Sequence, residues 1–228
     1  MATNYGTAPI VTNGLVFYVD PLNTKSYTSG SLTTTDMIGS QELTATTVFN
    51  VPDSSYWYIN SVNDVFKKTG SETLLSFSTQ LTMIGWFSYQ GSGNAGRILE
   101  MYIAGGALTF GHALAIDTDG SVRGWMDRNG GSSTRVLELD DSTTYNSGWH
   151  MLAYTYDGST AKLYVDGVQK DSAAGSYSDL DDIANIAIGG ATSTYHADAY
   201  IGPVQIYNRG LTATEVTQNY NALKSRFE

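Results

Sequence analysis

Cysteine is absent from all 228 residues of the chain. This absence excludes a disulfide framework and any thiolate metal site, and with them the small cross-linked secreted scaffolds. Basic residues are also few, with 12 lysines and arginines against 22 acidic residues and a formal charge of −10. Because such a surface repels phosphates and anionic lipid headgroups, neither nucleic acid nor a membrane is expected as a partner.

Long apolar runs are missing as well. No stretch approaches the roughly 18 apolar residues that a membrane-spanning helix requires. The first residues include neither a basic start nor an apolar core of the secretory-signal type. We therefore expect a soluble protein that is made in a cytoplasm. No internal repeat of roughly 20 to 50 residues is visible, which argues against propellers and solenoids.

Strand signals dominate what is present, most clearly in the middle of the chain. The segment Trp149–Tyr156 is apolar or aromatic on both alternating faces, which is typical of a central strand covered on both sides. Ala161–Asp166 alternates between apolar and polar residues, as a half-buried antiparallel strand does. The dipeptides Asp157-Gly158 and Asp166-Gly167 are strong signals for tight turns. Together these segments predict a β-meander.

Further short strands are expected along the chain, with turn signals between them and almost no helix. This pattern predicts an all-β fold, a jelly-roll sandwich of two antiparallel sheets with one short C-terminal helix. The expected strands are Leu15–Asp20, Leu43–Phe49, Tyr56–Ile59, Leu81–Tyr89, Gly96–Ile103, His112–Asp117, Ser121–Asp127, Arg135–Leu139, Ile183–Ile188 and Ala199–Tyr207.

The helix is expected near the end of the chain. Thr212 and Glu215 have the spacing of a capping box, in which each side chain binds the backbone amide of the other residue. Leu211 and Val216 stand at the positions of a hydrophobic staple. An apolar stripe that would dock on the sandwich is formed by Val216, Tyr220, Leu223 and Phe227.

One domain is expected over residues 14–228. Residues 1–13 precede it, where Pro9 favours an extended path. They are interpreted either as a free arm that docks on a partner or as the first strand of the sandwich, beginning at Ile10 and Val11.

Three segments carry a resemblance to a known family. They are the hairpin Trp149–Gly167 with its Leu-Tyr-Val-Asp-Gly ending, the closing segment Ile201–Val216 and the opening segment Gly14–Asp20. The first two resemble concanavalin A-like domains of the laminin G and pentraxin type. The opening segment, together with Asn219–Phe227, resembles such domains in structural proteins of tailed phages. The fold hosts lectins, glucanases, adhesion modules and virion parts, so it does not by itself specify a role.

The phage resemblance implies a virion surface protein, most simply a capsid decoration or accessory protein, and the missing catalytic residues described below make it a non-enzymatic one. Such a protein would be made in the host cytoplasm, exposed on the particle, bound to other virion proteins and assembled as a homo-oligomer. The alternative is a carbohydrate-binding adhesion module that recognises a host from the tail, with a glycan as its partner.

Catalytic residues are not found. Laminarinase-like glucanases of this fold carry Glu-x-Asp-x-x-Glu on one strand, which places a nucleophile and an acid beside one sugar. This sequence lacks that motif, and Glu138 with Asp140 and Asp141 is interpreted as a strand end followed by a solvated turn. Its three histidines show no zinc-ligand spacing. We therefore expect no enzymatic activity and no required cofactor.

Two kinds of binding site are considered. A structural calcium ion is possible because carboxylates grouped in loops suit this ion, and the candidate ligands are Asp117, Asp119, Asp179, Asp181 and Asp182. Carbohydrate is the other, since aromatic faces pack on sugar rings. The candidate aromatic residues near expected loops or strand ends are Trp57, Trp125, Tyr177 and Tyr195. Aromatic residues are also favoured in strands for packing alone, so each could instead be a core residue.

Overall fold

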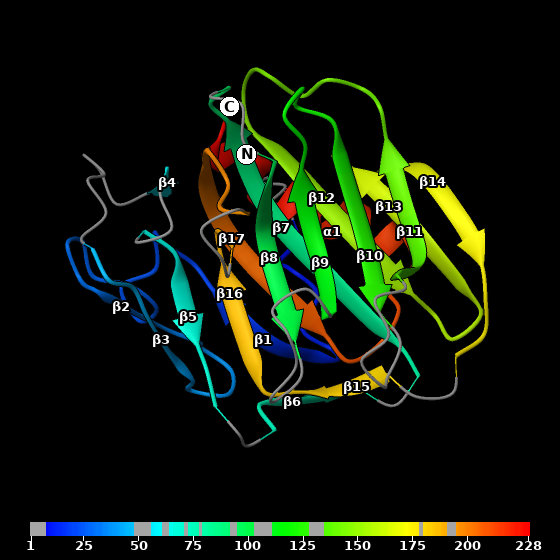
Figure 1. Cartoon of the computed structure of the whole chain (residues 1–228), viewed down its shortest axis with the longest axis horizontal. Coiled ribbons are helices and arrows are strands. Elements are labelled where there is room, and N and C mark those ends of the chain that lie inside the picture. Colours follow the sequence, from blue (N-terminus) through cyan, green and yellow to red (C-terminus); the bar gives the residue numbers. More distant parts are fainter. Residues whose placement is uncertain are drawn as a thin grey trace, which may run out of the picture.

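Two antiparallel sheets stacked face to face form the body of the chain (Figure 1). The computed structural model describes residues 8–47, 56–60, 64–70, 73–77, 79–91, 95–102, 111–127, 135–177, 180–190 and 195–228. The seven-stranded sheet has the order β1-β17-β7-β12-β13-β14, and β4 pairs with β17. Its strands are β1 Leu15–Val19, β4 Trp57–Ile59, β7 Leu81–Tyr89, β12 His150–Tyr156, β13 Thr160–Val165, β14 Val168–Ala174 and β17 Ala199–Tyr207.

The eight-stranded sheet has the order β11-β10-β9-β8-β16-β5-β3-β2. Its strands are β2 Thr33–Thr35, β3 Glu42–Thr44, β5 Phe66–Lys68, β8 Gly96–Tyr102, β9 Gly111–Ile116, β10 Val122–Asp127, β11 Arg135–Asp141 and β16 Asn185–Ile188. A small separate pair is formed by β6 Leu75–Phe77 and β15 Leu180–Ile183. In Figure 1 the strands β8 to β11 lie in front of β7 and β12, and the helix lies behind both layers.

The helix α1, Ala213–Leu223, covers the outer face of the seven-stranded sheet and leads into a 3-10 turn, Lys224–Arg226. This arrangement confirms the predicted all-β sandwich of two antiparallel sheets with one short C-terminal helix. The part of the chain that the structure describes contains no helix with the length and apolarity needed to span a bilayer.

Strand β12 is buried on both faces, as its sequence predicts. Leu152 and Tyr154 point into the main core between the sheets. Met151 and Ala153 point the other way, into a second apolar cluster that includes Trp86. Because α1 supplies the other side of this second cluster, the apolar residues on both faces of β12 are removed from water.

The start of α1 has the predicted capping box. Glu215 N donates to Thr212 Oγ1 at 3.3 Å, and Thr212 N donates to Glu215 Oε2 at 2.9 Å. Arg209 adds two contacts to the Glu215 carboxylate, at 2.9 and 2.6 Å. The hydrogen bonds from Arg209 lower the pKa of Glu215 to about 2. The carboxylate therefore remains charged across the neutral range and supports the positive end of the helix dipole.

The apolar stripe of the helix docks on the sheet as predicted. Val216 and Leu223 are buried. Trp86 of β7 stacks on Tyr220 with 5.6 Å between ring centroids and on Phe227 with 4.6 Å. The stability of the helix comes mainly from packing of this stripe and not from intrinsic helix propensity, because isolated helices of this length are only marginally stable in water.

Residues 8–13 lie against α1 and are not part of a strand. Val11 is 8% exposed. Its amide donates to Asn219 Oδ1 at 2.7 Å, and its carbonyl accepts from the Tyr207 hydroxyl at 2.9 Å. Asn219 Nδ2 in turn donates to the Tyr207 hydroxyl at 2.9 Å. This closed triangle fixes the described part of the N-terminal segment to the domain at Val11.

Replacing Asn219 by alanine should destabilise the protein by about 2 to 4 kcal/mol, because the Val11 amide and the Tyr207 hydroxyl each lose a buried partner. Urea unfolding of the full chain measures the change. The control is Asn221→Ala, which makes the same substitution on the same helix and should cost less than 1 kcal/mol. Equal costs for the two variants would show that the triangle does not hold the segment.

His112 on β9 lies fully inside the sandwich, with its ring edge-on to Phe77 at a centroid distance of 6.4 Å. Burial disfavours the charged imidazolium and lowers the pKa of His112 from 6.5 to about 4. Between these two values the unfolded chain binds a proton that the folded chain does not. The contribution of His112 to the free energy of unfolding is therefore fully present above pH 6.5 and is lost as the pH falls toward 4.

The variant His112→Leu should remove roughly 3 kcal/mol of the acid destabilisation that the wild type shows between pH 6.5 and 4. The measurement is the free energy of unfolding at several pH values for both proteins, each referenced to its own value near pH 8. Carboxylates contribute equally to the two curves, so their difference isolates the histidine. Parallel curves would contradict a neutral buried His112.

Candidate functional site

The outer face of the eight-stranded sheet carries a cluster of charged and aromatic side chains. Alternation along β10 directs Val122 and Met126 into the core and Arg123 and Trp125 outward. On the neighbouring strand β9, the outward positions are Ala113 and Ala115. We define the surface built on these strands and on β8 as the front face.

The two alanines make room for the larger side chains on either side. Ala115 is the register partner of both Arg97 on β8 and Arg123 on β10. Ala113 is likewise the partner of both Glu100 and Trp125. The small side chains of β9 thus leave a shallow space between the longer side chains of β8 and β10.

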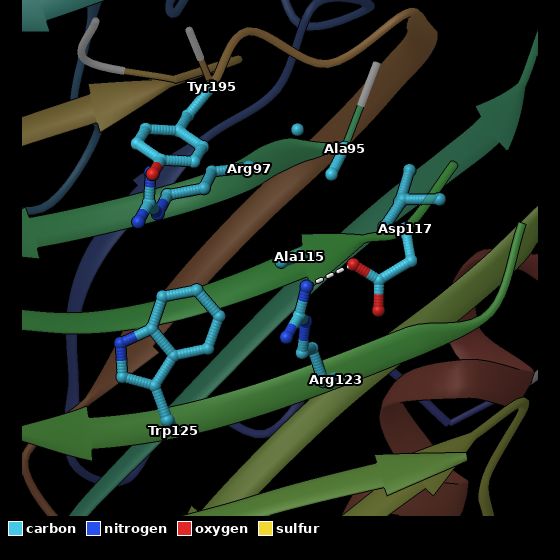
Figure 2. A pocket seen from close by; sticks show the side chains of 9 residues that line it. Ala95, Arg97, Ala115, Asp117, Arg123, Trp125 and Tyr195 are labelled. Carbon is cyan, nitrogen blue, oxygen red and sulfur yellow. Dashed lines mark hydrogen bonds and ion pairs between the residues drawn. The ribbon is translucent and has the colours of Figure 1, made fainter. Parts of the chain in front are cut away.

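Arg97 lies at the centre of this cluster and is 4% exposed. Its guanidinium carbon lies 4.3 Å from the ring centroid of Tyr195 and 5.2 Å from that of Trp125. Its Nε lies 3.2 Å from Glu100 Oε1, and both of these side chains are 4% exposed. Figure 2 shows Tyr195 and Trp125 reaching the Arg97 side chain from different elements. Cation–π contacts and an ion pair therefore hold the arginine in place.

Two glycines let the segment that carries Tyr195 approach β8. A Cβ at Gly96 would lie 2.1 Å from the backbone of Ala197, and one at Gly190 would lie 2.3 Å from the Tyr195 carbonyl. Because neither clash occurs with glycine, the Arg97 amide donates to the Tyr195 carbonyl at 3.1 Å. Tyr195 is thereby fixed above Arg97 while 37% of it stays exposed.

A small pocket opens beside this stack. Its volume is about 30 Å³, close to the share of one water molecule in the liquid. At its mouth Arg123 binds Asp117 and also Glu138, the latter at 3.3 Å. The pocket is therefore a shallow depression that could accept one substituent of a ligand lying across the front face. Its lining includes Arg97, Ala115, Asp117, Arg123, Trp125 and Tyr195 (Figure 2).

The four aromatic residues proposed for sugar contact have different surroundings. Trp57 has no exposed surface and packs edge-on against Tyr27 and Phe66, so its prediction is wrong: a ring in the core cannot contact a sugar. Trp125 lines the pocket but is 3% exposed, so it supports Arg97 instead of offering a free face. Tyr177 is half-buried against the core, and its amide donates to the Tyr156 hydroxyl. Tyr195 alone combines exposure with a place at the pocket.

The aspartates proposed as calcium ligands are not gathered by the described part of the chain. Asp117 pairs with Arg123, and Asp119 accepts hydrogen bonds from Ser121 in its own turn. Asp179 lies outside the described residues, as do the side chains of Asp181 and Asp182 on β15. Over the described ranges, no group of three or more histidines and carboxylates could hold a metal ion.

Two important residues of the site were missed from the sequence, Arg97 and Arg123. A usable signal was present in Gly-Arg-Ile-Leu-Glu-Met-Tyr at 96–102, where opposite charges stand three residues apart in an apolar strand. Charged residues are almost never fully buried unless they are paired, so two charges in this apolar strand indicate a need for partners. Their spacing does not predict that they pair with each other, because residues three apart on a regular strand face opposite sides. The irregularity between Arg97 and Leu99 brings Arg97 and Glu100 to the same face.

A comparison of the sequence with protein families assigns the chain to one of them. The sequence model of Laminin_G_3, described as the concanavalin A-like lectin/glucanases superfamily, matches residues 60–217, more than half of the chain. The chain belongs to this superfamily. No curated protein sequence matches it.

Solved structures with the same concanavalin A-like fold include two sugar complexes. Trypanosoma rangeli sialidase in complex with sialic acid is 15% identical, with a TM-score of 0.67 over 95% of this chain and 34% of that one. The botulinum neurotoxin serotype D ligand binding domain in complex with N-acetylneuraminic acid is 14% identical, with a TM-score of 0.67 over 91% of this chain and 50% of that one. The superfamily domain described here thus spans a third to a half of these proteins, and the likeness concerns the fold.

Proposed function

We propose that this concanavalin A-like domain binds carbohydrate on its front face without hydrolysing it. The observation that carries the proposal is the stack of Tyr195 on Arg97 beside an open pocket. A tyrosine that is exposed yet held in place offers a ring face to a sugar at low entropic cost. The sugar complexes of the two similar structures support this class of ligand.

Polar groups next to the ring fit the same ligand. The side chains of Arg123 and Asp117 are 32% and 27% exposed, so both remain accessible at the pocket mouth. Guanidinium groups donate and carboxylates accept, whereas a sugar hydroxyl does both. A pyranose packed on Tyr195 would place hydroxyls against this ion pair, which is the combination of apolar face and oriented polar groups that small-ligand sites use.

The absence of hydrolysis is proposed from the surroundings of Glu100. Glycosidases need two carboxyl groups about 5 to 9.5 Å apart on either side of the scissile bond. Glu100 pairs with Arg97, and its register partners on both neighbouring strands are alanines, Ala113 and Ala187. No second acid therefore stands beside Glu100 on the adjacent strands. The other two acids of the front face, Asp117 and Glu138, are both engaged in ion pairs with Arg123. These pairings support a binding role.

A virion surface is proposed as the place where this binding occurs. The proposal comes from the phage-like segments at the two ends of the domain. Arg226 joins them, since its two terminal nitrogens each lie 2.8 Å from an Asp20 oxygen. Host recognition by a particle-bound module and attachment as a homo-oligomeric decoration protein are both compatible with a sugar-binding front face. Co-sedimentation with assembled capsids tests this location.

Tyr195→Ala should abolish binding to whichever glycans the wild type selects on a glycan array, because it removes the ring face. Its melting temperature should stay within a few degrees of the wild type, since the side chain is exposed. Tyr177→Ala is the matched control: it removes a half-buried tyrosine outside the pocket and should leave glycan binding unchanged. Retained binding by Tyr195→Ala would remove the site from consideration.

Incubation with laminarin, agarose and similar polysaccharides should release no reducing ends. The wild type is compared with Glu100→Gln and with Glu138→Gln, which alter the two glutamates nearest the front-face arginines. Turnover by the wild type that disappears in either variant would show that the domain is an enzyme.

A further inference from the structure

The charged groups around the Tyr195 stack neutralise one another almost completely. Arg97 pairs with Glu100, and Arg123 pairs with both Asp117 and Glu138. Lys67 on β5 also interacts electrostatically with Glu100 across their shared register partner Ala187. These six side chains have three positive and three negative formal charges, a balance of zero. The whole chain has a formal charge of −10. Each arginine of the front face is therefore already matched by a carboxylate.

We infer that the sugar bound here is uncharged, and that the site selects against anionic sugars such as sialylated or sulfated glycans. This inference rests on the proposed function and specifies its ligand class. It also separates this domain from the two similar structures, whose bound sugars, sialic acid and N-acetylneuraminic acid, are acids.

An anionic sugar would meet two obstacles at Arg123. The charge of that guanidinium is already matched by Asp117 and Glu138, which both contact it. An acidic group that bound to a remaining N–H of Arg123 would also lie beside these two carboxylates, and like charges at this separation repel. Arg97 offers no alternative, because it is 4% exposed and covered by Tyr195.

A neutral sugar avoids both obstacles. Within the described residues, Asp117 contacts Arg123 through Oδ1, which leaves its second oxygen, Oδ2, as an acceptor. One hydroxyl of the sugar can donate to this oxygen, and a neighbouring hydroxyl can accept from Arg123. The ion pair therefore offers one acceptor and one donor that are already in place. Two adjacent hydroxyls of the sugar can bind to them while the contact between Asp117 and Arg123 stays intact.

The test uses the full chain on an array that carries neutral glycans together with their sialylated and sulfated counterparts. The strongest neutral ligand and its sialylated counterpart are then titrated by calorimetry at about 0.02 M and 0.5 M salt, conditions that change electrostatic screening strongly. We expect the neutral glycan to bind at least about tenfold more tightly. Its affinity should be nearly independent of salt.

The variant Asp117→Asn supplies the second readout. It removes one negative charge from the pocket mouth while Arg123 keeps Glu138, and it should raise the affinity for the sialylated glycan about tenfold relative to the neutral one. Glu42→Gln is the matched control. It removes the same charge from an exposed position on β3, four strands away from β9, and should leave the ratio unchanged.

Preferred binding of the sialylated or sulfated glycans, weakened by salt, would overturn the inference and leave the proposed function intact. An unchanged ratio in Asp117→Asn would also overturn it, because the charge of Asp117 would then play no part. If the wild type binds no glycan on the array, both the proposed function and the inference are wrong.

Discussion

The seven-stranded sheet carries large apolar side chains on both of its faces, and this constraint organises the rest of the chain. On β7 all nine residues are buried, and on β12 six of seven are. One face is covered by the second sheet and the other by α1, which begins at the Thr212 cap and packs on Trp86. With the helix placed there, the sheet face left to present polar side chains is the front face of the eight-stranded sheet. The location of the proposed site is therefore a consequence of how the core is completed.

Strong local patterns predicted most of the architecture. Asp166 and Gly167 have φ angles of +53° and +79°, as the Asp-Gly hairpin signal indicates. The capping box at Thr212 and Glu215 has the expected hydrogen bonds. The strand β14 was missed because most of its side chains are exposed. The strands β5, β6 and β15 were missed because they have three or four residues each and little alternation. Such strands depend on partners that are distant in sequence, which local periodicity does not report.

The candidate site was predictable only in part, for a similar reason. Tyr195 and Asp117 were chosen from the sequence and do line the pocket, whereas Trp57 was chosen on the same grounds and lies in the core. Whether an aromatic residue next to a loop faces water depends on which strand pairs beside it. The role of Arg97 depends even more on pairing, since its ring contacts come from β10 and from the segment before β17.

A second group of aromatic rings provides a natural comparison for the proposed site. Tyr56, Trp149 and Tyr200 lie together near β4 and β17, with ring centroids 4.6 Å apart for Tyr56 and Tyr200 and 5.5 Å apart for Tyr56 and Trp149. Trp149 also stacks on Phe227 at 4.5 Å. These rings pack on one another. The pair of Arg226 and Asp20 borders them at Phe227, where the guanidinium carbon lies 5.5 Å from the ring centroid.

The most direct measurement is an NMR titration of the isotopically labelled full chain with the strongest glycan ligand, which maps the residues whose signals move. If sugar binds on the front face, the largest shifts fall on Tyr195, Ala115 and Arg123. Shifts confined to Tyr56, Trp149 and Tyr200 would contradict front-face binding and place sugar binding on the opposite face of the sandwich.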